Sequence, residues 1–264
     1  MPLISATIIT HNEAANIARA IQSLACADEI VVVDSGSTDR TAQIASQLGA
    51  RVVFHPWEGF AAQKNFASAE AAHDWILSLD ADEELNEDAR LAVAEWKKSV
   101  PSAAAYRFAR RARYRGRWIL HSGWYPDWKV RLFDRRQARW QGDYVHESVE
   151  TDQRVETLEG EILHYTCNTF ADHEKRIEFY TDLAAREMWA GGRSPGGLRR
   201  ALLPPWTFVH SYLLRLGVLD GVAGFQIAWM AARYVRRKNA KLEKLTAGGG
   251  KEPKSKESAR GSGA

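Results

Sequence analysis

The 264-residue chain lacks the features that define several common protein classes. Its only two cysteines, Cys26 and Cys167, form no spacing motif, which suits a reducing cytosol and predicts two small core residues. Neither G-x-G-x-x-G after the first apolar segment nor G-x-x-x-x-G-K-S/T occurs, so the usual dinucleotide and P-loop sites are excluded. No apolar run reaches the roughly 20 residues of a plain membrane span, and no signal peptide is expected.

The composition predicts a packed core with an uneven distribution of charge. Hydrophobic residues make up 45% of the chain and ten residues are tryptophan, which excludes global disorder. Residues 186–264 carry 15 Lys/Arg against 5 Asp/Glu, and residues 1–185 carry 21 against 28, net charges of +10 and −7. A basic C-terminal third indicates an anionic partner. Because the body is acidic and no RNA- or DNA-binding motif is present, we expect a phospholipid surface and no nucleic acid.

Short apolar runs alternate with helical patterns in the first hundred residues. We expect strands at 3–10, 29–33, 51–54 and 75–79. A first helix is expected to begin at 11–13, with Ile17, Ile21 and Leu24 on one face, and another covers 59–72. This alternation predicts βαβ units and a parallel sheet with right-handed crossovers.

The stretch W-I-L-S-L-D-A-D-E-E at 75–84 ends an apolar strand in acids. In an extended chain, Asp80 and Asp82 leave the same face, and two neighbouring carboxylates repel each other unless a cation lies between them. Hard oxygen ligands suit Mg²⁺ or Mn²⁺. The alternative is an acidic turn that caps the next helix.

Four motifs in order resemble family 2 glycosyltransferases of the GT-A fold. They are T-H-N-E at 10–13, V-V-D-S-G-S-T-D at 32–39, Q-K-N at 63–65 and D-A-D at 80–82. The segments G-W-Y-P-D at 123–127, R-L-F at 131–133 and W-Q-G-D-Y-V-H-E at 140–147 resemble a subgroup that includes bacterial lipopolysaccharide inner-core β-glucosyltransferases. The resemblance implies an α/β fold, with a mixed, mainly parallel sheet flanked by helices and a helical C-terminal extension.

The resemblance also implies a site for a UDP-sugar at the strand ends. The implied residues are Thr10, Asn12, Glu13, Asp34, Ser35, Lys64, Asn65, Asp80 and Ala81. Asp34 would accept a hydrogen bond from the nucleobase, although it could instead be a turn acid that caps the next helix. Lys64 would approach the nucleotide or its diphosphate, but a lysine on an alanine-rich helix could equally face solvent.

A divalent metal, Mg²⁺ or Mn²⁺, is implied by the same resemblance. Asp82, assisted by Asp80, would bind the ion that bridges the two phosphates. His146 or His164 could add a ligand or contact the acceptor, and a hydrogen-bonded structural histidine is the alternative for each. Such an ion stabilises the charge on the departing diphosphate.

One general base is required, because family 2 enzymes invert the anomeric centre in a single displacement. The candidates are Glu147 and Asp127. Glu147 is favoured because it follows Gly142 and Asp143, in the region where relatives carry a catalytic acid after a glycine-containing loop. The pair His146-Glu147 departs from the commoner Glu-Asp pair, so both candidates stay open.

Six arginines between residues 106 and 117 alternate with Tyr and Phe, which predicts a strand pair with a basic face. These arginines could bind the phosphates of a phosphorylated saccharide acceptor or simply be solvated. Nearby tryptophans could stack on sugar rings or belong to the core. They are Trp118, Trp124, Trp128 and Trp140.

The C-terminal third predicts an amphipathic helix at 172–189, a glycine-rich break at 191–197 and apolar segments at 202–232. A basic cluster follows at 233–244. This arrangement resembles an interfacial anchor on an anionic membrane, and a helical subdomain with a solvated basic rim is the alternative.

We therefore expect three regions. They are a glycosyltransferase domain at 1–170, with a nucleotide-sugar half (1–100) and an acceptor half (101–170), a helical, basic extension at 171–245, and a disordered tail at 246–264. The expected activity is the inverting, metal-dependent transfer of a hexose, glucose, from a UDP-sugar. The expected acceptor is a lipid-linked saccharide such as lipopolysaccharide core, and the expected location is the cytoplasmic face of the inner membrane. The rivals are a sugar nucleotidyltransferase, whose glycine-rich N-terminal loop is absent, and an inactive or nucleic-acid-binding module on the same fold.

Overall fold

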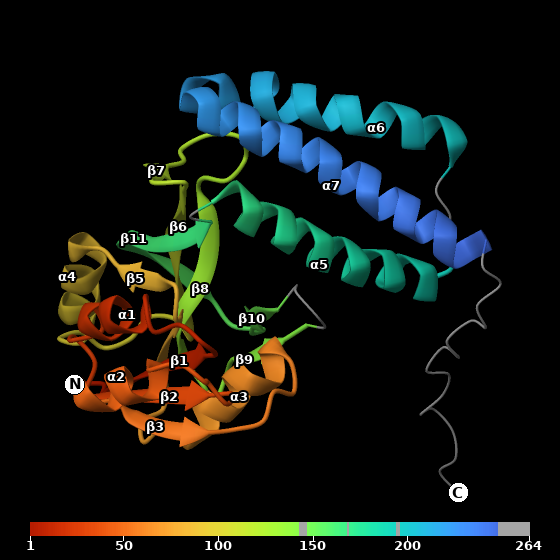
Figure 1. Ribbon diagram of the computed structural model, residues 1–264. Coiled ribbons are helices and arrows are strands. Elements are labelled where there is room, and N and C mark those ends of the chain that lie inside the picture. The colour runs from red at the N-terminus through yellow and green to blue at the C-terminus, as the bar shows by residue number, and fades with distance from the viewer. Residues whose placement is uncertain (143–146, 168, 194–195, 248–264) are drawn as a thin grey trace, which may run out of the picture. The chain divides into compact units, whose positions relative to one another are not determined.

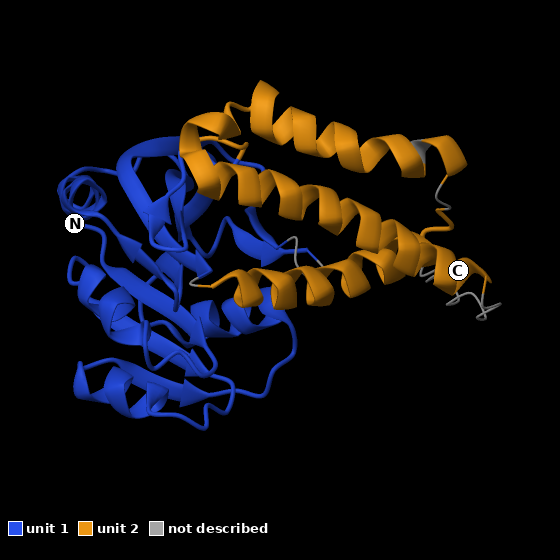
Figure 2. Cartoon of the chain, turned by 45° about the horizontal axis from the view of Figure 1, so that its top comes forward, with its two compact units in different colours: residues 1–120, 124–168 blue, residues 121–123, 169–264 orange. Residues whose placement is uncertain are grey.

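The computed structural model describes residues 1–142, 147–167, 169–193 and 196–247. The chain forms two compact units, which are coloured separately in Figure 2. Unit 1 contains residues 1–120 and 124–168, and unit 2 contains residues 121–123 and 169–264. The domain boundaries at 170 and 245 set from the sequence stay predictions.

Unit 1 is built on a mixed sheet with the strand order β3-β2-β1-β4-β8-β6-β11-β5, and β7 pairs with β6 (Figure 1). The strands are β1 (Ile4–Thr10), β2 (Glu29–Asp34), β3 (Arg51–Phe54), β4 (Trp75–Asp80), β5 (Glu83–Leu85), β6 (Ala105–Tyr114), β7 (Arg117–Trp118), β8 (Asp127–Asp134) and β11 (Val155–Cys167). β1 to β4 are parallel, as expected from the alternating pattern. β8 runs antiparallel to both β4 and β6, while β11 is parallel to β6. A separate ribbon pairs β9 (Arg139–Gln141) with β10 (Ser148–Glu150).

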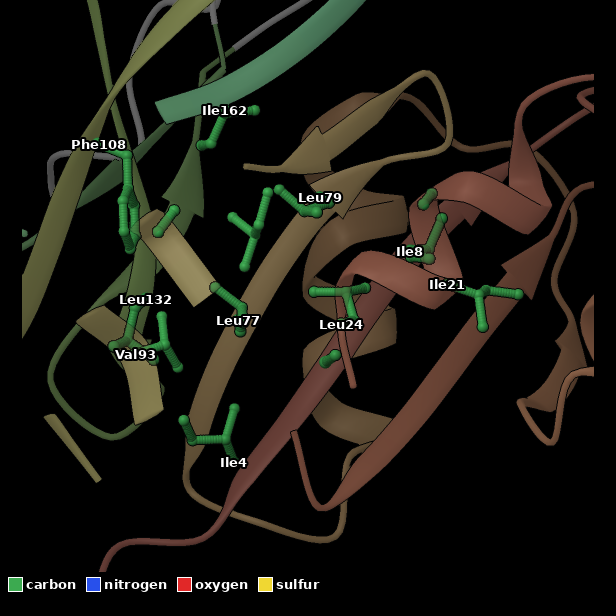
Figure 3. Packing of buried hydrophobic residues seen from close by; sticks show 14 of the residues in the cluster. Ile4, Ile8, Ile21, Leu24, Leu77, Leu79, Val93, Phe108, Leu132 and Ile162 are labelled. Carbon is green, nitrogen blue, oxygen red and sulfur yellow. The ribbon is translucent and has the colours of Figure 1, made fainter. Parts of the chain in front are cut away.

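Helices cover both faces of the parallel strands. They are α1 (Ile17–Ser23), α2 (Thr41–Gln47), α3 (Phe60–Glu70) and α4 (Glu87–Trp96). Every residue of β1 is buried: Ile8 packs in the main core with Ile21 of α1 and with Leu24, which follows that helix (Figure 3). Ile9 packs in a second cluster with Ala67 of α3. A strand covered on both faces has no polar side, which is why these segments are continuous apolar runs. The expected fold class is confirmed.

The first helix begins later than the sequence pattern predicts. α1 begins at Ile17 and not at 11–13, although Ile17, Ile21 and Leu24 are buried as expected. Asn12 has a φ of 56°, in the left-handed region, and its backbone N–H donates to Ser37 Oγ over 2.8 Å. A residue in that conformation cannot belong to a right-handed helix, so residues 11–13 form a loop instead.

Unit 2 consists of α5 (Phe170–Ala190), α6 (Gly197–Val209), the π-helix η1 (His210–Leu214), the 3₁₀-helix η2 (Gly217–Asp220) and α7 (Gly221–Ala247). The helix expected at 172–189 is therefore confirmed by α5, and α7 packs against both α5 and α6. The turn between α6 and α7 is tightly packed: a Cβ on Gly224 would lie 1.8 Å from the carbonyl oxygen of Gly217. The tail expected from residue 246 lies outside the described residues, except that α7 continues to Ala247.

No single helix in the described ranges is long and apolar enough to cross a membrane. The pair Arg200–Leu214 and Gly217–Ala247, bent by 74° at the break, meets the length and composition criteria together.

Candidate active site

Two loops at the carboxyl ends of β1 and β2 are joined by hydrogen bonds. The backbone N–H of Thr38 donates to Asn12 Oδ1 (2.8 Å), that of Glu13 donates to Thr41 Oγ1 (2.8 Å), and that of Ser35 donates to the carbonyl of Thr10 (3.0 Å). Parallel strands place their carboxyl ends at one edge of a sheet, and ligands of open α/β sheets bind there. The structure thus brings together the sequence-predicted residues Thr10, Asn12, Glu13 and Ser35.

Asp34 ends β2 and is buried within its own loop. Its Oδ2 accepts from the backbone N–H groups of Gly36 (3.0 Å) and Ser37 (2.9 Å), and the Ser37 hydroxyl donates to Oδ1. In this structure the carboxylate therefore orders its own turn, and it does not cap α2, which begins at Thr41. Gln63 extends this network, because its Nε2 donates to Ser35 Oγ over 2.9 Å.

Lys64 is the most informative side chain of the site. It lies on α3 and is 1% exposed, so the interpretation of a solvent-facing lysine is wrong. Its Nζ lies 2.9 Å from Asp80 Oδ1 and 3.1 Å from Glu147 Oε1, and 4.3 Å from the ring centre of Trp140. The next residue, Asn65, fixes this arrangement through two hydrogen bonds with the backbone of Trp140, at 2.9 and 3.1 Å.

Asp80 lies between two buried cations. Arg131 Nη2 is 3.0 Å from Asp80 Oδ2, opposite the contact with Lys64. Burial raises the pKa of the Asp80 carboxyl, but Lys64 and Arg131 lower it by more, and the pKa falls well below its usual range. Asp80 is therefore ionised and neutralised by protein groups.

Glu83 extends the ion pairs beyond Arg131. It is fully buried and its carboxylate lies 2.9 Å from both Arg131 Nη2 and Arg110 Nη1. Arg110 then pairs with Asp127 over 2.6 Å. The sequence pattern predicted no role for Glu83 and placed Arg110 only among the arginines of the basic strand face. Glu83 stands between two other acids and Arg110 next to another arginine, so apolar periodicity gave no signal for this ion pair.

Asp127, at the start of β8, is held by cations. Both Nε and Nη2 of Arg110 contact its Oδ2, at 3.0 and 2.6 Å, and Lys129 Nζ lies 3.2 Å from Oδ1. Burial raises the pKa of the Asp127 carboxyl, and Arg110 and Lys129 lower it by more, so the net pKa is below the usual value. A carboxylate held in this way is a weak proton acceptor.

Asp80 and Asp82 do not belong to one continuous strand, as the extended-chain argument assumed. β4 ends at Asp80 and β5 begins at Glu83, so residues 81–82 form a turn. The Glu83 carboxylate helps to close this turn by accepting from the Asp80 backbone N–H over 3.2 Å. The same-face argument fails because it holds only for a continuous strand.

Asp82 faces His164 of β11, with 3.3 Å between Asp82 Oδ2 and His164 Nε2. No cluster of three or more His, Cys, Asp or Glu side chains suited to a metal occurs in the described part of the chain. A carboxylate oxygen with an imidazole nitrogen is nevertheless a donor pair that suits Mn²⁺ better than Mg²⁺, which prefers oxygen ligands; either ion takes further ligands from substrate phosphates and water. His146, the other predicted ligand, lies outside the described residues.

The arginine-rich segment forms the predicted strand pair, β6 with β7. Arg110 and Arg111 are used in ion pairs, the latter with Glu161. Two other arginines stack on aromatic rings: Arg107 lies 4.8 Å from the ring centre of Trp128, and Arg113 lies 5.8 Å from that of Trp118. The basic face is therefore smaller than the count of six arginines indicates. Trp140, in contrast, is buried core.

Comparison with known proteins identifies the family. Residues 5–151 match the family model described as glycosyl transferase family 2. An uncharacterized glycosyltransferase of Rickettsia bellii (strain RML369-C) is 34% identical over 268 residues, which cover 92% of this chain and 87% of that protein. The lipopolysaccharide core biosynthesis glycosyltransferase LpsC of Rhizobium meliloti (strain 1021) is 30% identical over 254 residues, 92% of each chain. Among solved structures, glucosyl-3-phosphoglycerate synthase from Mycobacterium tuberculosis is 28% identical over 44% of this chain and 45% of that one, with a TM-score of 0.33. The chain belongs to glycosyl transferase family 2 and is a glycosyltransferase.

Proposed function

We propose that this protein transfers a hexose, glucose, from a UDP-sugar to a saccharide acceptor with inversion at the anomeric carbon. The observation that carries the proposal is the position of Lys64, which contacts both the strand-end acid Asp80 and the candidate base Glu147. One buried cation thereby joins the donor side of the site to the acceptor side. The catalytic domain would span residues 1–170, followed by the helical extension at 171–245.

The donor would lie across the ends of β1, β2 and β4. The joined loops at 10–13 and 34–38 would hold the nucleoside, with Asp34 accepting from the nucleobase after local rearrangement of its loop contacts. Lys64 would compensate the charge of the diphosphate. Asp82 and His164 would hold a divalent metal, which when bound supplies charge stabilisation for the departing diphosphate.

Glu147 would act as the general base. The acceptor hydroxyl oxygen would attack the anomeric carbon and pass its proton to the Glu147 carboxylate, while the bond from that carbon to the diphosphate oxygen breaks and UDP leaves with the electron pair. Asp127 is the weaker candidate because Arg110 and Lys129 hold its carboxylate. Lys64 would keep the Glu147 side chain in place between turnovers.

The acceptor would be a phosphorylated or lipid-linked saccharide at the cytoplasmic face of the inner membrane. The name of the relative LpsC, a lipopolysaccharide core biosynthesis glycosyltransferase, supports this class. Arg107 and Arg113, each beside a tryptophan ring, would offer a cation and a stacking surface to such a molecule.

Calorimetric titration with a panel of nucleoside-diphosphate sugars, with Mn²⁺ and then with EDTA, tests the proposal. Metal-dependent binding of one uridine donor is the expected result. Failure of every sugar nucleotide to bind would refute it.

A further inference from the structure

The helical hairpin of unit 2 exposes large apolar side chains along one face of α6. Leu198, Leu202, Trp206 and Val209 are separated by four, four and three residues, and all are exposed, Leu202 by 58%. This spacing places them on one side of a helix. A soluble surface tolerates single exposed apolar residues, but an aligned series indicates a binding face.

The same pattern continues on α7. Val222, Phe225 and Trp229 are separated by three and four residues, and Val222 is 73% exposed. The connecting turn adds Leu213, Leu216 and Leu219, each at least half exposed. We call the exposed apolar residues of α6, the turn and α7 the hairpin face.

Charge is nearly absent from this hairpin. Residues 201–232 contain only two charged side chains, Arg215 and Asp220. Asp220 is 3% exposed and accepts from the His121 backbone over 3.0 Å, so it is turned away from solvent. Arg215 is exposed in the turn, between two exposed leucines. The only charge presented with the hairpin face in this stretch is therefore positive.

Three of the six cations in the basic cluster of α7, which the sequence indicated as one part of the anchor, form ion pairs within unit 2. Arg233 and Arg237 pair with Glu174 of α5 at 2.8 and 2.7 Å. Lys241 pairs with Glu178 and Asp182 at 2.7 and 2.9 Å. These contacts hold α7 against α5 and leave Arg236 exposed, two turns after Trp229 on the same side of α7.

We infer that the hairpin face inserts into the interfacial region of a phospholipid membrane, with the apolar side chains below the headgroups and Arg215 and Arg236 at headgroup level. By length and composition, the bent pair Arg200–Leu214 and Gly217–Ala247 meets the criteria for a broken span or a re-entrant loop. Trp206 and Trp229, each at least half exposed, are suited to the boundary between headgroups and acyl chains. The inference rests on the proposed location at a membrane and makes burial of apolar area, and not the basic cluster, the main attractive force.

Flotation of the full-length protein with vesicles tests this inference. Wild-type protein is expected to float with pure phosphatidylcholine vesicles, more strongly when phosphatidylglycerol is added, and to remain bound in about 1 M salt, where charges are screened beyond about 3 Å. Leu202→Glu and Val222→Glu should each lower the partition coefficient by at least about tenfold, since each removes one apolar anchor. The matched control Leu91→Glu, at a 62% exposed position on α4, should change it less than about twofold.

Three outcomes would overturn the inference. The first is unchanged flotation of both hairpin variants. The second is binding that requires phosphatidylglycerol and is lost in high salt, which would assign attachment to basic residues. The third is a wild-type dimer without lipid that Leu202→Glu converts to a monomer, which would assign the face to a second copy of the chain.

Calorimetry with sugar nucleotides on the same samples separates this inference from the proposed activity. Both hairpin variants should bind a donor as the wild type does. A protein that floats through the hairpin face but binds no sugar nucleotide would refute the activity and leave the membrane inference intact.

Discussion

The ammonium group of Lys64 lies 3.1 Å from the carboxylate of Glu147, although 83 residues separate them in the chain. The same ammonium group contacts Asp80 at 2.9 Å. Diphosphate, when bound, would compete with these two carboxylates for Lys64, because all three are anions. Under the proposed function, the contact would link occupation of the donor site to the environment of the candidate base.

Replacement of Lys64 should destabilise the fold as well as the site. Lys64→Met leaves Asp80 and Glu147 without their shared cation, and we expect the free energy of unfolding to fall by about 3 kcal/mol. Urea denaturation measures the loss. The control Lys98→Met breaks an exposed pair with Glu95 and should cost less than about 0.5 kcal/mol. Equal losses in the two variants would contradict a structural role for the buried pair.

The identity of the base is tested by two isosteric changes. Glu147→Gln should lower the rate of transfer by about 10² to 10⁴-fold and leave donor affinity nearly unchanged, because the amide fills the same space but accepts no proton. Asp127→Asn should retain transfer, since its carboxylate is held by Arg110. Single-turnover assays with calorimetry of donor binding provide the measurement. Loss of transfer in Asp127→Asn, with transfer retained in Glu147→Gln, would identify Asp127 and not Glu147 as the base.

Removal of either proposed metal ligand should weaken metal-dependent donor binding. Asp82→Ala and His164→Ala each delete one side chain of the 3.3 Å pair, and we expect the affinity for Mn²⁺ in the presence of UDP to fall by about tenfold or more. Manganese titration followed by electron paramagnetic resonance reports this affinity directly. Asp152→Ala, at an exposed position outside the proposed site, is the control. Wild-type manganese affinity in both ligand variants would place the metal elsewhere.

Stability should depend on pH through His173 of α5. Burial, helped by Arg176, lowers the pKa of His173 from 6.5 to about 4. Between about pH 4 and pH 6.5, the side chain of His173 therefore binds a proton in the unfolded chain but not in the folded chain. The contribution of this residue to the free energy of unfolding is thus complete above about pH 6.5 and falls as the pH drops towards about 4. Urea denaturation measures the free energy of unfolding at about pH 7 and pH 5. The difference between the two values should be smaller for His173→Gln than for the wild type. An exposed control, His11→Gln, should retain the wild-type difference.

Local patterns predicted much of unit 1. The four parallel strands were identified from apolar runs, since strands covered on both faces must be apolar throughout. The acids at their ends were predicted to form a site because carboxyl ends of parallel strands converge, and that assignment stays a prediction. Two local predictions were wrong at turns: the start of α1, where Asn12 has a positive φ, and the D-A-D segment, where β4 ends at Asp80. Single residues decide where an element ends, and apolar periodicity does not detect them.

The sequence by itself determined the family, the strand-end motifs and the apolar and basic character of the C-terminal third. Only the tertiary structure decided which charges meet: Lys64 with Glu147, Arg131 with Glu83, and the cations of α7 with the acids of α5. The reason is that an ion pair depends on distances of a few ångströms between segments tens of residues apart, and chain crossovers set those distances. The same pairing uses three cations of α7 within unit 2, whereas the apolar side chains of the hairpin face are exposed.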